Sequence, residues 1–274
     1  MTMQKLIELN DGNHIPAIGL GVWKATPEQA GAAVVEALEA GYRHIDTAAI
    51  YENEDGVGTG LSRAGLPRED VFVTTKIWND AQGVHKTAQA LDASLKRLKL
   101  DYVDLLLIHW PVPGQNLYVE TWQALAQARE AGKVRSIGVS NFTEEHLQRL
   151  VDETGIVPTI NQIELHPFFQ QHDLRAVHQR MGIRTQAWSP LGQSEALQDT
   201  TIVAIAARHK RTPAQIVLRW QLQLGNIAIP KSVTPERIRS NFDVFDFALG
   251  DDDMAAIAGL DRDGRMGPDP LLFP

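Results

Sequence analysis

The chain has 274 residues, of which 43% are hydrophobic and 22% charged; this suits one large α/β domain or two smaller ones and excludes a disordered chain. A net charge of −8 argues against a nucleic-acid partner, and the absence of cysteine excludes disulfides, thiolate metal ligands and a cysteine nucleophile. No apolar run approaches the roughly 20 residues that span a bilayer, and the N-terminal segment lacks the apolar core of a signal peptide, so we expect a cytoplasmic protein without a membrane partner.

Short β-branched segments alternate with amphipathic helical segments along the chain. A hairpin comes first, with Leu6–Asn10 and His14–Ile18 on either side of a turn at Asp11-Gly12. Strands are then expected at Ala17–Val22, Arg43–Thr47, Val71–Ile77, Val103–His109, Ser136–Ser140, Thr159–Glu164, Arg184–Trp188 and Asn226–Pro230. Helices are expected at Pro27–Ala40, Glu52–Ala64, Val84–Leu98, Leu117–Ala131, Glu144–Glu153, Asp173–Met181, Asp199–His209, Pro213–Leu224, Pro235–Asn241 and Asp251–Leu260.

This order of elements predicts the fold class. Alternating strands and helices are typical of a parallel sheet, and eight such units in about 250 residues favour a closed (β/α)8 barrel, or TIM barrel, over an open sheet. The N-terminal hairpin would plug the bottom of this barrel, and the Gly- and Pro-rich tail Asp261–Pro274 is expected to be irregular. Because no linker or low-complexity segment divides the chain, we expect residues 1–274 to form a single domain.

Polar residues end three consecutive predicted strands. Asp46, Lys76 and His109 occupy these ends, and Tyr51 follows Asp46 by five residues. In a barrel of this type the strand ends form the active-site face. Taken singly, the acid could be a helix cap, the lysine a solvated loop residue and the histidine a core imidazole. Together they suit proton donation: a cation lowers the pKa of a phenol, which starts near ~10, a carboxylate holds the cation, and an imidazole orients the substrate oxygen.

Three motifs resemble the signatures of the aldo-keto reductase family, in the family's order and over nearly the whole chain. They are Gly41–Ala48 with Tyr51, Glu54 and Gly58; Lys133–Phe142; and Ile229–Val233 with Arg237 and Asn241. Within the family, four segments are most similar to bacterial 2,5-diketo-D-gluconate reductases: Asn10–Asn13, Thr75–Asp80, Asn161–Pro167 and Asn241–Phe247.

The resemblance implies a reductase that reduces small polar carbonyls with NADPH. Its catalytic tetrad would be Asp46, Tyr51, Lys76 and His109. Tyr51 would donate the proton, Lys76, held by Asp46, would lower the pKa of that phenol, and His109 would orient the carbonyl.

The resemblance also implies the cofactor site. Ser140, Asn141 and Gln162 match residues that bind the nicotinamide carboxamide, and Trp188 matches the aromatic residue on which the nicotinamide ring stacks. The loop that would cross the pyrophosphate contains Ser189, Leu191 and Gln193. The residues that would surround the 2′-phosphate end of the cofactor are Lys231, Ser232, Val233, Arg237 and Asn241. Two cations and a hydroxyl near a helix start favour NADPH over NADH. Ser240 departs from the acid that many relatives carry, which puts the adenine contact in doubt.

The expected substrate pocket is lined by residues that follow strand ends. These are Trp23, Ile50, Trp78 and Trp110. Aromatic walls with one polar corner suit a small carbonyl compound, with keto-sugar acids such as 2,5-diketo-D-gluconate, methylglyoxal and β-keto esters as candidates. On the resemblance, the C-terminal tail is expected to cover the rim of this pocket, and the protein is expected to act as a monomer.

The same residues are open to two other interpretations, and one glycine run resembles a cofactor-binding motif. A non-catalytic NADPH-binding sensor would keep the same residues, so the sequence leaves it open. A metal-dependent hydrolase would use His44, Asp46, His109 and His166, but we expect His44 and Asp46 on opposite faces of their strand and find no H-x-H pair at a strand end, so no metal site is expected. The run Gly56–Gly60 lies inside a predicted helix with the wrong spacing for a dinucleotide-binding turn.

Overall fold

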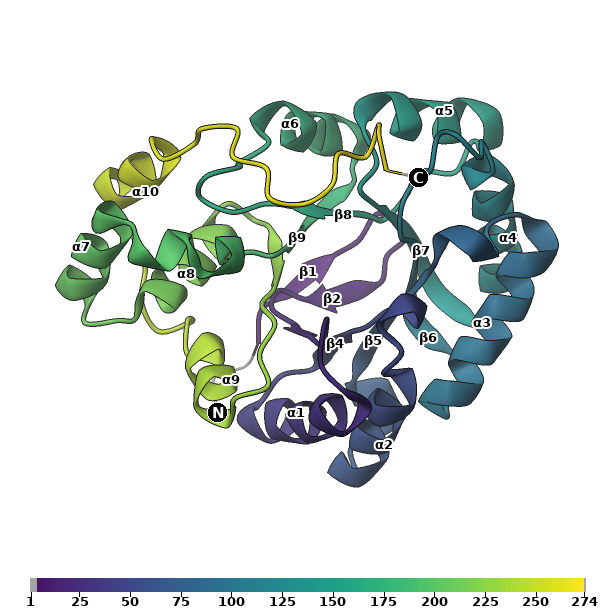
Figure 1. The fold of residues 1–274 in the computed structure, drawn as a ribbon, viewed down its shortest axis with the longest axis horizontal. Helices are drawn as coiled ribbons and strands as arrows, with labels where there is room; N and C mark the ends of the chain where they lie inside the picture. Colours follow the sequence, from purple (N-terminus) through teal and green to yellow (C-terminus); the bar gives the residue numbers. More distant parts are fainter. Residues whose placement is uncertain (1–3, 274) are drawn as a thin grey trace.

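The computed structural model describes residues 4–273, which form a barrel of parallel strands surrounded by helices (Figure 1). Residues 1–3 and Pro274 lie outside the described residues, so the ends of the predicted domain and the last residue of the predicted tail lie outside them too. The eight barrel strands are β3 (Leu20–Gly21), β4 (His44–Asp46), β5 (Phe72–Ile77), β6 (Val103–Ile108), β7 (Val134–Ser140), β8 (Ile160–Glu164), β9 (Arg184–Trp188) and β10 (Ile227–Ile229).

The barrel strands neighbour one another in chain order, and every pairing is parallel. Single bridges from Ile18 to Ala228 and from Gly21 to Lys231 join the first strand to the last, so the sheet closes on itself. This confirms the predicted (β/α)8 barrel. The prediction was wrong in detail for the first strand, predicted at Ala17–Val22, whose regular part covers only Leu20–Gly21; the last strand, Ile227–Ile229, lies within one residue of its predicted bounds. These edges pair through isolated bridges instead of a continuous ladder.

Ten α-helices lie within the described residues, most at or within two residues of their predicted bounds. They are α1 (Pro27–Ala40), α2 (Glu54–Ala64), α3 (Val84–Leu98), α4 (Tyr118–Glu130), α5 (Glu144–Thr154), α6 (His172–Met181), α7 (Thr200–His209), α8 (Pro213–Gln223), α9 (Pro235–Phe242) and α10 (Asp251–Ala258). Local capping explains their sharp starts, since the side chains of Thr26, Thr143 and Thr212 each accept a hydrogen bond from the backbone three residues on.

Alternation along each strand divides the core into two layers. On β6, Leu106 and Ile108 join the large buried cluster between the strands and the helices, whereas Leu105 and Leu107 belong to a smaller cluster inside the barrel. The hairpin strands β1 (Leu6–Glu8) and β2 (His14–Pro16) bring Ile15 into the smaller cluster. The hairpin therefore closes the end of the barrel at which the strands begin, which leaves the opposite end for the site.

The glycine run in α2 serves helix packing. A β-carbon at Gly56 would lie 2.0 Å from the carbonyl oxygen of Pro27 in α1, and one at Gly60 would lie 2.6 Å from the carbonyl oxygen of Gly31. The backbones of α1 and α2 therefore touch directly. The run is part of a helix, as the sequence predicted, and it makes no turn between strand and helix. Among residues 4–273, no helix has the length and apolar character needed to cross a membrane.

Candidate active site

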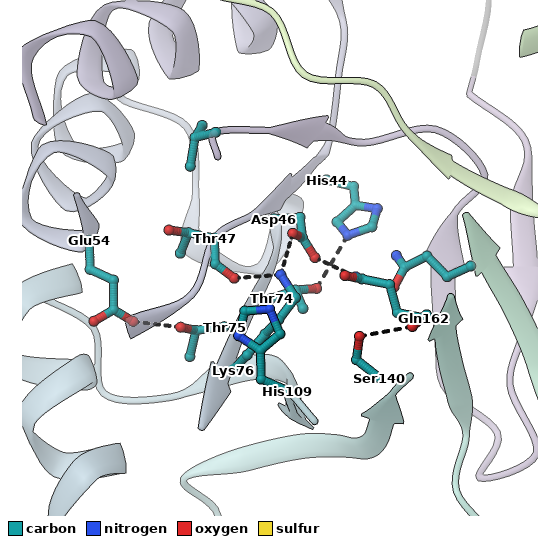
Figure 2. A network of polar contacts seen from close by, with 12 residues as sticks. His44, Asp46, Thr47, Glu54, Thr74, Thr75, Lys76, His109, Ser140 and Gln162 are labelled. Atoms are coloured by element: carbon teal, nitrogen blue, oxygen red, sulfur yellow. Dashed lines mark hydrogen bonds and ion pairs between the residues drawn. The ribbon is translucent and has the colours of Figure 1, made fainter. Parts of the chain in front are cut away.

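The four predicted catalytic residues meet at the end of the barrel opposite the hairpin. Asp46 ends β4, Lys76 lies one residue before the end of β5, and His109 directly follows β6. Tyr51 ends a short 3-10 helix, Ala49–Tyr51, in the loop after β4. Figure 2 shows Asp46 and Lys76 pointing toward each other inside the barrel, with His109 beside them.

Lys76 is fully buried and has two oxygen partners. Its Nζ donates to Asp46 Oδ1 at 2.6 Å and to the carbonyl oxygen of Thr47 at 2.9 Å. The other carboxylate oxygen of Asp46 accepts a hydrogen bond from Gln162 Nε2 at 2.8 Å (Figure 2). The attraction of Asp46 raises the pKa of Lys76 although burial acts against it, so the lysine is a fixed cation. Burial of an ammonium ion has a large cost in desolvation free energy, and the ion pair with Asp46 offsets this cost.

The pKa of Tyr51 departs from the expectation. Lys76 Nζ lies 5.1 Å from the centre of the Tyr51 ring, and its charge pulls the pKa of the phenol down. Burial outweighs this pull and raises the pKa of Tyr51 above its usual value of 10.0, so Lys76 lowers the pKa as predicted but the net direction is upward. The sequence shows which charges lie near the phenol but not how much water it loses. The phenol therefore stays protonated at neutral pH, as a proton donor must.

His109 is a neutral imidazole at the mouth of this cluster. Its ring lies 5.8 Å from that of Tyr51 and 5.0 Å from that of Trp78, centre to centre. Burial, with the charge of Lys76 adding to it, holds the pKa of His109 well below 6.5. A neutral imidazole can donate one N–H hydrogen bond without bringing a second positive charge next to Lys76.

Asp46, Tyr51 and His109 line a cavity of about 390 Å³, whereas Lys76 is fully buried and reaches it only through its contact with Asp46. All four residues of the expected substrate pocket line it, namely Trp23, Ile50, Trp78 and Trp110. Trp23 and Ile50 are partly exposed, which places them at the rim. The predicted cofactor residues that line the cavity are Asn141, Gln162, Trp188, Ser189, Gln193 and Lys231.

The residues proposed for the nicotinamide end form one polar network. Trp188 Nε1 donates to Asn141 Oδ1 at 2.8 Å, and Asn141 Nδ2 donates to the carbonyl oxygen of His109 at 3.0 Å. Ser140 lies beneath the cavity, where its hydroxyl donates to the carbonyl oxygen of Gln162 at 2.8 Å. In this structure Ser140 therefore supports Asn141 and Gln162 and does not itself face the cavity.

The remaining predicted cofactor residues lie outside the cavity. Leu191 precedes a short 3-10 helix after β9, and the others lie between β10 and the end of α9: Ser232, Val233, Arg237 and Asn241. Arg237 is exposed on α9, as a residue that contacts the outer end of a long ligand has to be. Ser232 Oγ accepts from the backbone N–H of Thr234 and so shapes the turn that leads into α9.

Three residues that line the cavity have a strained backbone. Asn141, Ser189 and Gln193 all line it, and all have a positive φ, of 63°, 47° and 48°. Residues other than glycine rarely adopt this conformation, and they keep it where the surrounding structure holds them in a functional geometry.

One argument against the metal-site alternative was wrong, namely the expected orientation of His44 and Asp46. His44 and Asp46 are two residues apart on β4 and therefore point to the same side of the strand, not to opposite sides. The imidazole of His44 is nevertheless engaged elsewhere, since its Nε2 contacts Thr74 Oγ1 at 3.2 Å. Burial lowers the pKa of His44 to about 3, so this imidazole is neutral. Within residues 4–273 no group of three or more potential metal ligands comes together.

The sequence interpretation missed several cavity residues. Three of them lie at or next to strand ends: Gly21, Val22 and Ile229. Four more belong to the tail, which was expected at the rim of the pocket but with no residue named: Met266, Gly267, Pro268 and Phe273. It also passed over Glu164, whose carboxylate is buried at the end of β8 and accepts hydrogen bonds from the tail. The rule that found Asp46 and Lys76, a polar residue at a strand end, would have found Glu164.

A family profile decides the relationship. The profile described as "Aldo/keto reductase family" matches residues 17–262. The chain belongs to the aldo-keto reductase family. It is 57% identical over 271 residues to an aldo-keto reductase of Mycolicibacterium smegmatis, covering 99% of this chain and 98% of the relative. It is 55% identical over 275 residues to the methylglyoxal reductase DkgA of Yersinia pestis, covering 100% and 99%.

Solved structures of the family agree with the fold. A mutant of Gox0644 in complex with NADPH superposes with a TM-score of 0.96 at 51% identity, covering 99% of each chain. This aldo-keto reductase is therefore an oxidoreductase with a TIM-barrel fold, and the resemblance inferred from the three motifs is confirmed.

Proposed function

We propose that this aldo-keto reductase reduces small polar aldehydes and ketones to alcohols with NADPH, and that Tyr51 donates the proton. The observation that carries the proposal is the buried ion pair of Lys76 and Asp46, 2.6 Å apart, beside a cavity that Asp46, Tyr51 and His109 line. A buried lysine with a specific carboxylate partner, beside a phenol and an imidazole that line a cavity, is an arrangement typical of active sites.

The residues around the cavity fit a nicotinamide cofactor. Trp188 offers an aromatic face at the cavity wall, and Asn141 and Gln162 offer amide groups beside it. Gln162 Nε2 donates to Asp46 and to Gln186, which leaves its oxygen to accept from a carboxamide. Lys231 lines the cavity on the side of α9, where Arg237 is exposed, and a dianionic 2′-phosphate suits these two cations. Bound NADPH supplies a hydride to the carbonyl carbon.

The side chains divide the remaining work. His109 donates a hydrogen bond to the carbonyl oxygen and holds it near the phenol of Tyr51. As negative charge develops on that oxygen, Tyr51 transfers its proton to it, and the resulting phenolate is stabilised by the ammonium of Lys76. Asp46 keeps Lys76 in place and charged. Positioned proton transfer of this kind is commonly worth about 10²–10⁴ in rate.

The walls of the cavity favour small substrates. Trp78 and Trp110 line the cavity, and the Trp78 ring lies beside the imidazole of His109, so an aromatic wall borders the polar corner formed by Tyr51 and His109. Methylglyoxal, 2,5-diketo-D-gluconate and β-keto esters carry the small, flat, oxygen-rich carbonyl groups that such a corner accepts. The similarity to a methylglyoxal reductase supports the first of these.

The test measures reduction of each of the three substrates as the loss of cofactor absorbance at 340 nm, first with NADPH and then with NADH. Tyr51→Phe is expected to lower kcat by about 10²–10⁴ and to keep NADPH binding, measured as quenching of tryptophan fluorescence. Tyr102→Phe is the matched control, because this phenol contacts Arg135 and does not line the cavity. Parent-like turnover by Tyr51→Phe would refute the donor assignment, and quenching without any turnover in the parent would favour the sensor alternative.

A further inference from the structure

Glu164 is a fully buried carboxylate that the proposed chemistry does not use. It ends β8, and three donors surround it. Oε1 accepts from the backbone N–H of Met266 at 2.7 Å and lies 3.0 Å from His166 Nε2, and Oε2 accepts from the backbone N–H of Gly267 at 2.9 Å. Burial favours the neutral acid, but these hydrogen bonds outweigh it and hold the pKa of Glu164 below its usual range. The carboxylate is therefore charged and bound on both oxygens.

The two backbone donors belong to the C-terminal tail, residues 261–273, which follows α10. The tail can be followed from α10 past α6 to the end of the chain in Figure 1. Before it reaches Glu164, the backbone N–H groups of Arg262 and Gly264 donate to the carbonyl oxygen of Phe168, and the Arg262 guanidinium lies 3.9 Å from the centre of the Phe168 ring. After Gly267 the tail is more open to solvent: the exposed fractions of Leu271 and Leu272 are 55% and 81%.

The hydrogen bonds to Glu164 set which residues of the tail contact the aromatic side chains of the cavity. A β-carbon at Gly267 would lie 2.4 Å from the Trp188 ring, so the tail backbone touches that ring directly. Six residues further on, the Phe273 ring packs 4.4 Å from the Trp110 ring and 6.2 Å from the Trp78 ring, centre to centre. Phe273 is thus the outer wall of the aromatic part of the cavity. The hydrogen bond from Gly267 to Glu164 ties the tail to the barrel before it, and the hydrogen bonds of Leu271 and Phe273 to Asp269 stay within the tail.

We propose that Glu164 is a positioning residue for the carbonyl substrate. Its buried carboxylate fixes the tail at Met266 and Gly267, so that Phe273 closes the pocket over small substrates. This inference rests on the proposed function for the identity of the substrate, but the attachment of the tail can be measured without any turnover. Each backbone hydrogen bond to a charged acceptor is a strong one, and two of them together oppose the release of an otherwise exposed segment.

Glu164→Gln is the informative variant. An amide offers one acceptor oxygen and places an NH₂ group against one of three donors, so the attachment of the tail weakens while the volume of the side chain is kept. The peptide bond between Arg265 and Met266 contains the nitrogen that Glu164 binds, which makes limited digestion with trypsin a direct probe of attachment. We expect Glu164→Gln to be cut there about tenfold faster than the parent, in the absence of cofactor and substrate.

The same variant is expected to raise KM for methylglyoxal about tenfold and to leave kcat within about twofold, since the tetrad is unchanged. KM for a bulky aldehyde such as 4-nitrobenzaldehyde should change less, because an open wall favours the larger substrate. Glu195→Gln is the matched control: Glu195 also faces the tail, but its carboxylate is exposed and lies 4.0 Å from Arg262. It should match the parent in cleavage rate and in both KM values.

Met266→Pro removes one of the two donors from the side of the tail and leaves the barrel interior untouched, so it tests the inference if Glu164→Gln does not fold. It should reproduce the selective rise in KM. Cleavage of Glu164→Gln at the parent rate, or an unchanged KM in both variants, would overturn the positioning role. Absence of turnover in the parent would overturn the proposed function instead, and the cleavage comparison would still show whether Glu164 holds the tail.

Discussion

A buried histidine provides the sharpest test of the structure. His178 lies on α6, where its Nε2 is 2.9 Å from Asn161 Nδ2 and its Nδ1 is 2.8 Å from Thr185 Oγ1. Because the same Asn161 Nδ2 donates to the carbonyl oxygen of Phe142, the amide is held with its N–H groups toward the imidazole. His178 must therefore accept at Nε2, and a second proton there would place two donors face to face. Burial, with a smaller contribution from the charge of Arg175, lowers the pKa of His178 from 6.5 to about 3.

The pH dependence follows from the direction of this shift. At pH 7.5 neither the folded nor the unfolded histidine is protonated, so His178 contributes no pH dependence. As the pH falls through 6.5, the unfolded chain binds a proton that the folded protein cannot, and the free energy of unfolding falls. At pH 5 the loss amounts to about 2 kcal/mol, a value set by the unfolded pKa as long as the folded pKa stays below about 4.

The assay is urea unfolding of the parent and of His178→Gln at pH 7.5 and pH 5.0. Glutamine keeps an acceptor for Asn161 and does not titrate, so the variant should lose about 2 kcal/mol less than the parent between the two pH values. His85→Gln, a substitution of an exposed histidine on α3, should lose as much as the parent. If His178→Gln and the parent lost the same amount within about 0.5 kcal/mol, His178 would not be held neutral by the fold.

Three further predictions test other parts of the structure. Gly56→Ala should cost about 3 kcal/mol or more in urea unfolding, because the new methyl group meets helix backbone at 2.0 Å, whereas Gly114→Ala, with open space around it, should be neutral. Arg237→Ala should weaken NADPH binding at least about tenfold and leave NADH binding unchanged in fluorescence titrations; equal losses would exclude a contact with the 2′-phosphate. Asp46→Asn leaves Lys76 buried without a counter-ion and should destabilise the protein by about 3–5 kcal/mol in thermal unfolding, and a parent-like melting temperature would contradict the ion pair.

Local patterns in the sequence were sufficient for most of the fold. Capping signals such as Thr212-Pro213 act within one helical turn, which is why the predicted and observed starts of α8 coincide. The strand ends at Asp46, Lys76 and His109 could be aligned because parallel strands of a barrel all point to one face. The prediction of strand bounds was least accurate at the first barrel strand, near Leu20, because pairing there depends on a strand more than 200 residues further along the chain.

The sequence by itself determined the barrel, the family and the residues that carry the proposed chemistry, since these follow from short motifs and from periodicity. Only the tertiary structure decided the quantities that depend on burial and on distant contacts. Burial raised the pKa of Tyr51 against the pull of Lys76, and no pattern of residues reports how much water a phenol loses. The attachment of Gly267 to Glu164 joins residues 103 positions apart, and such a contact exists only once the chain has closed its barrel and brought the tail back across the mouth.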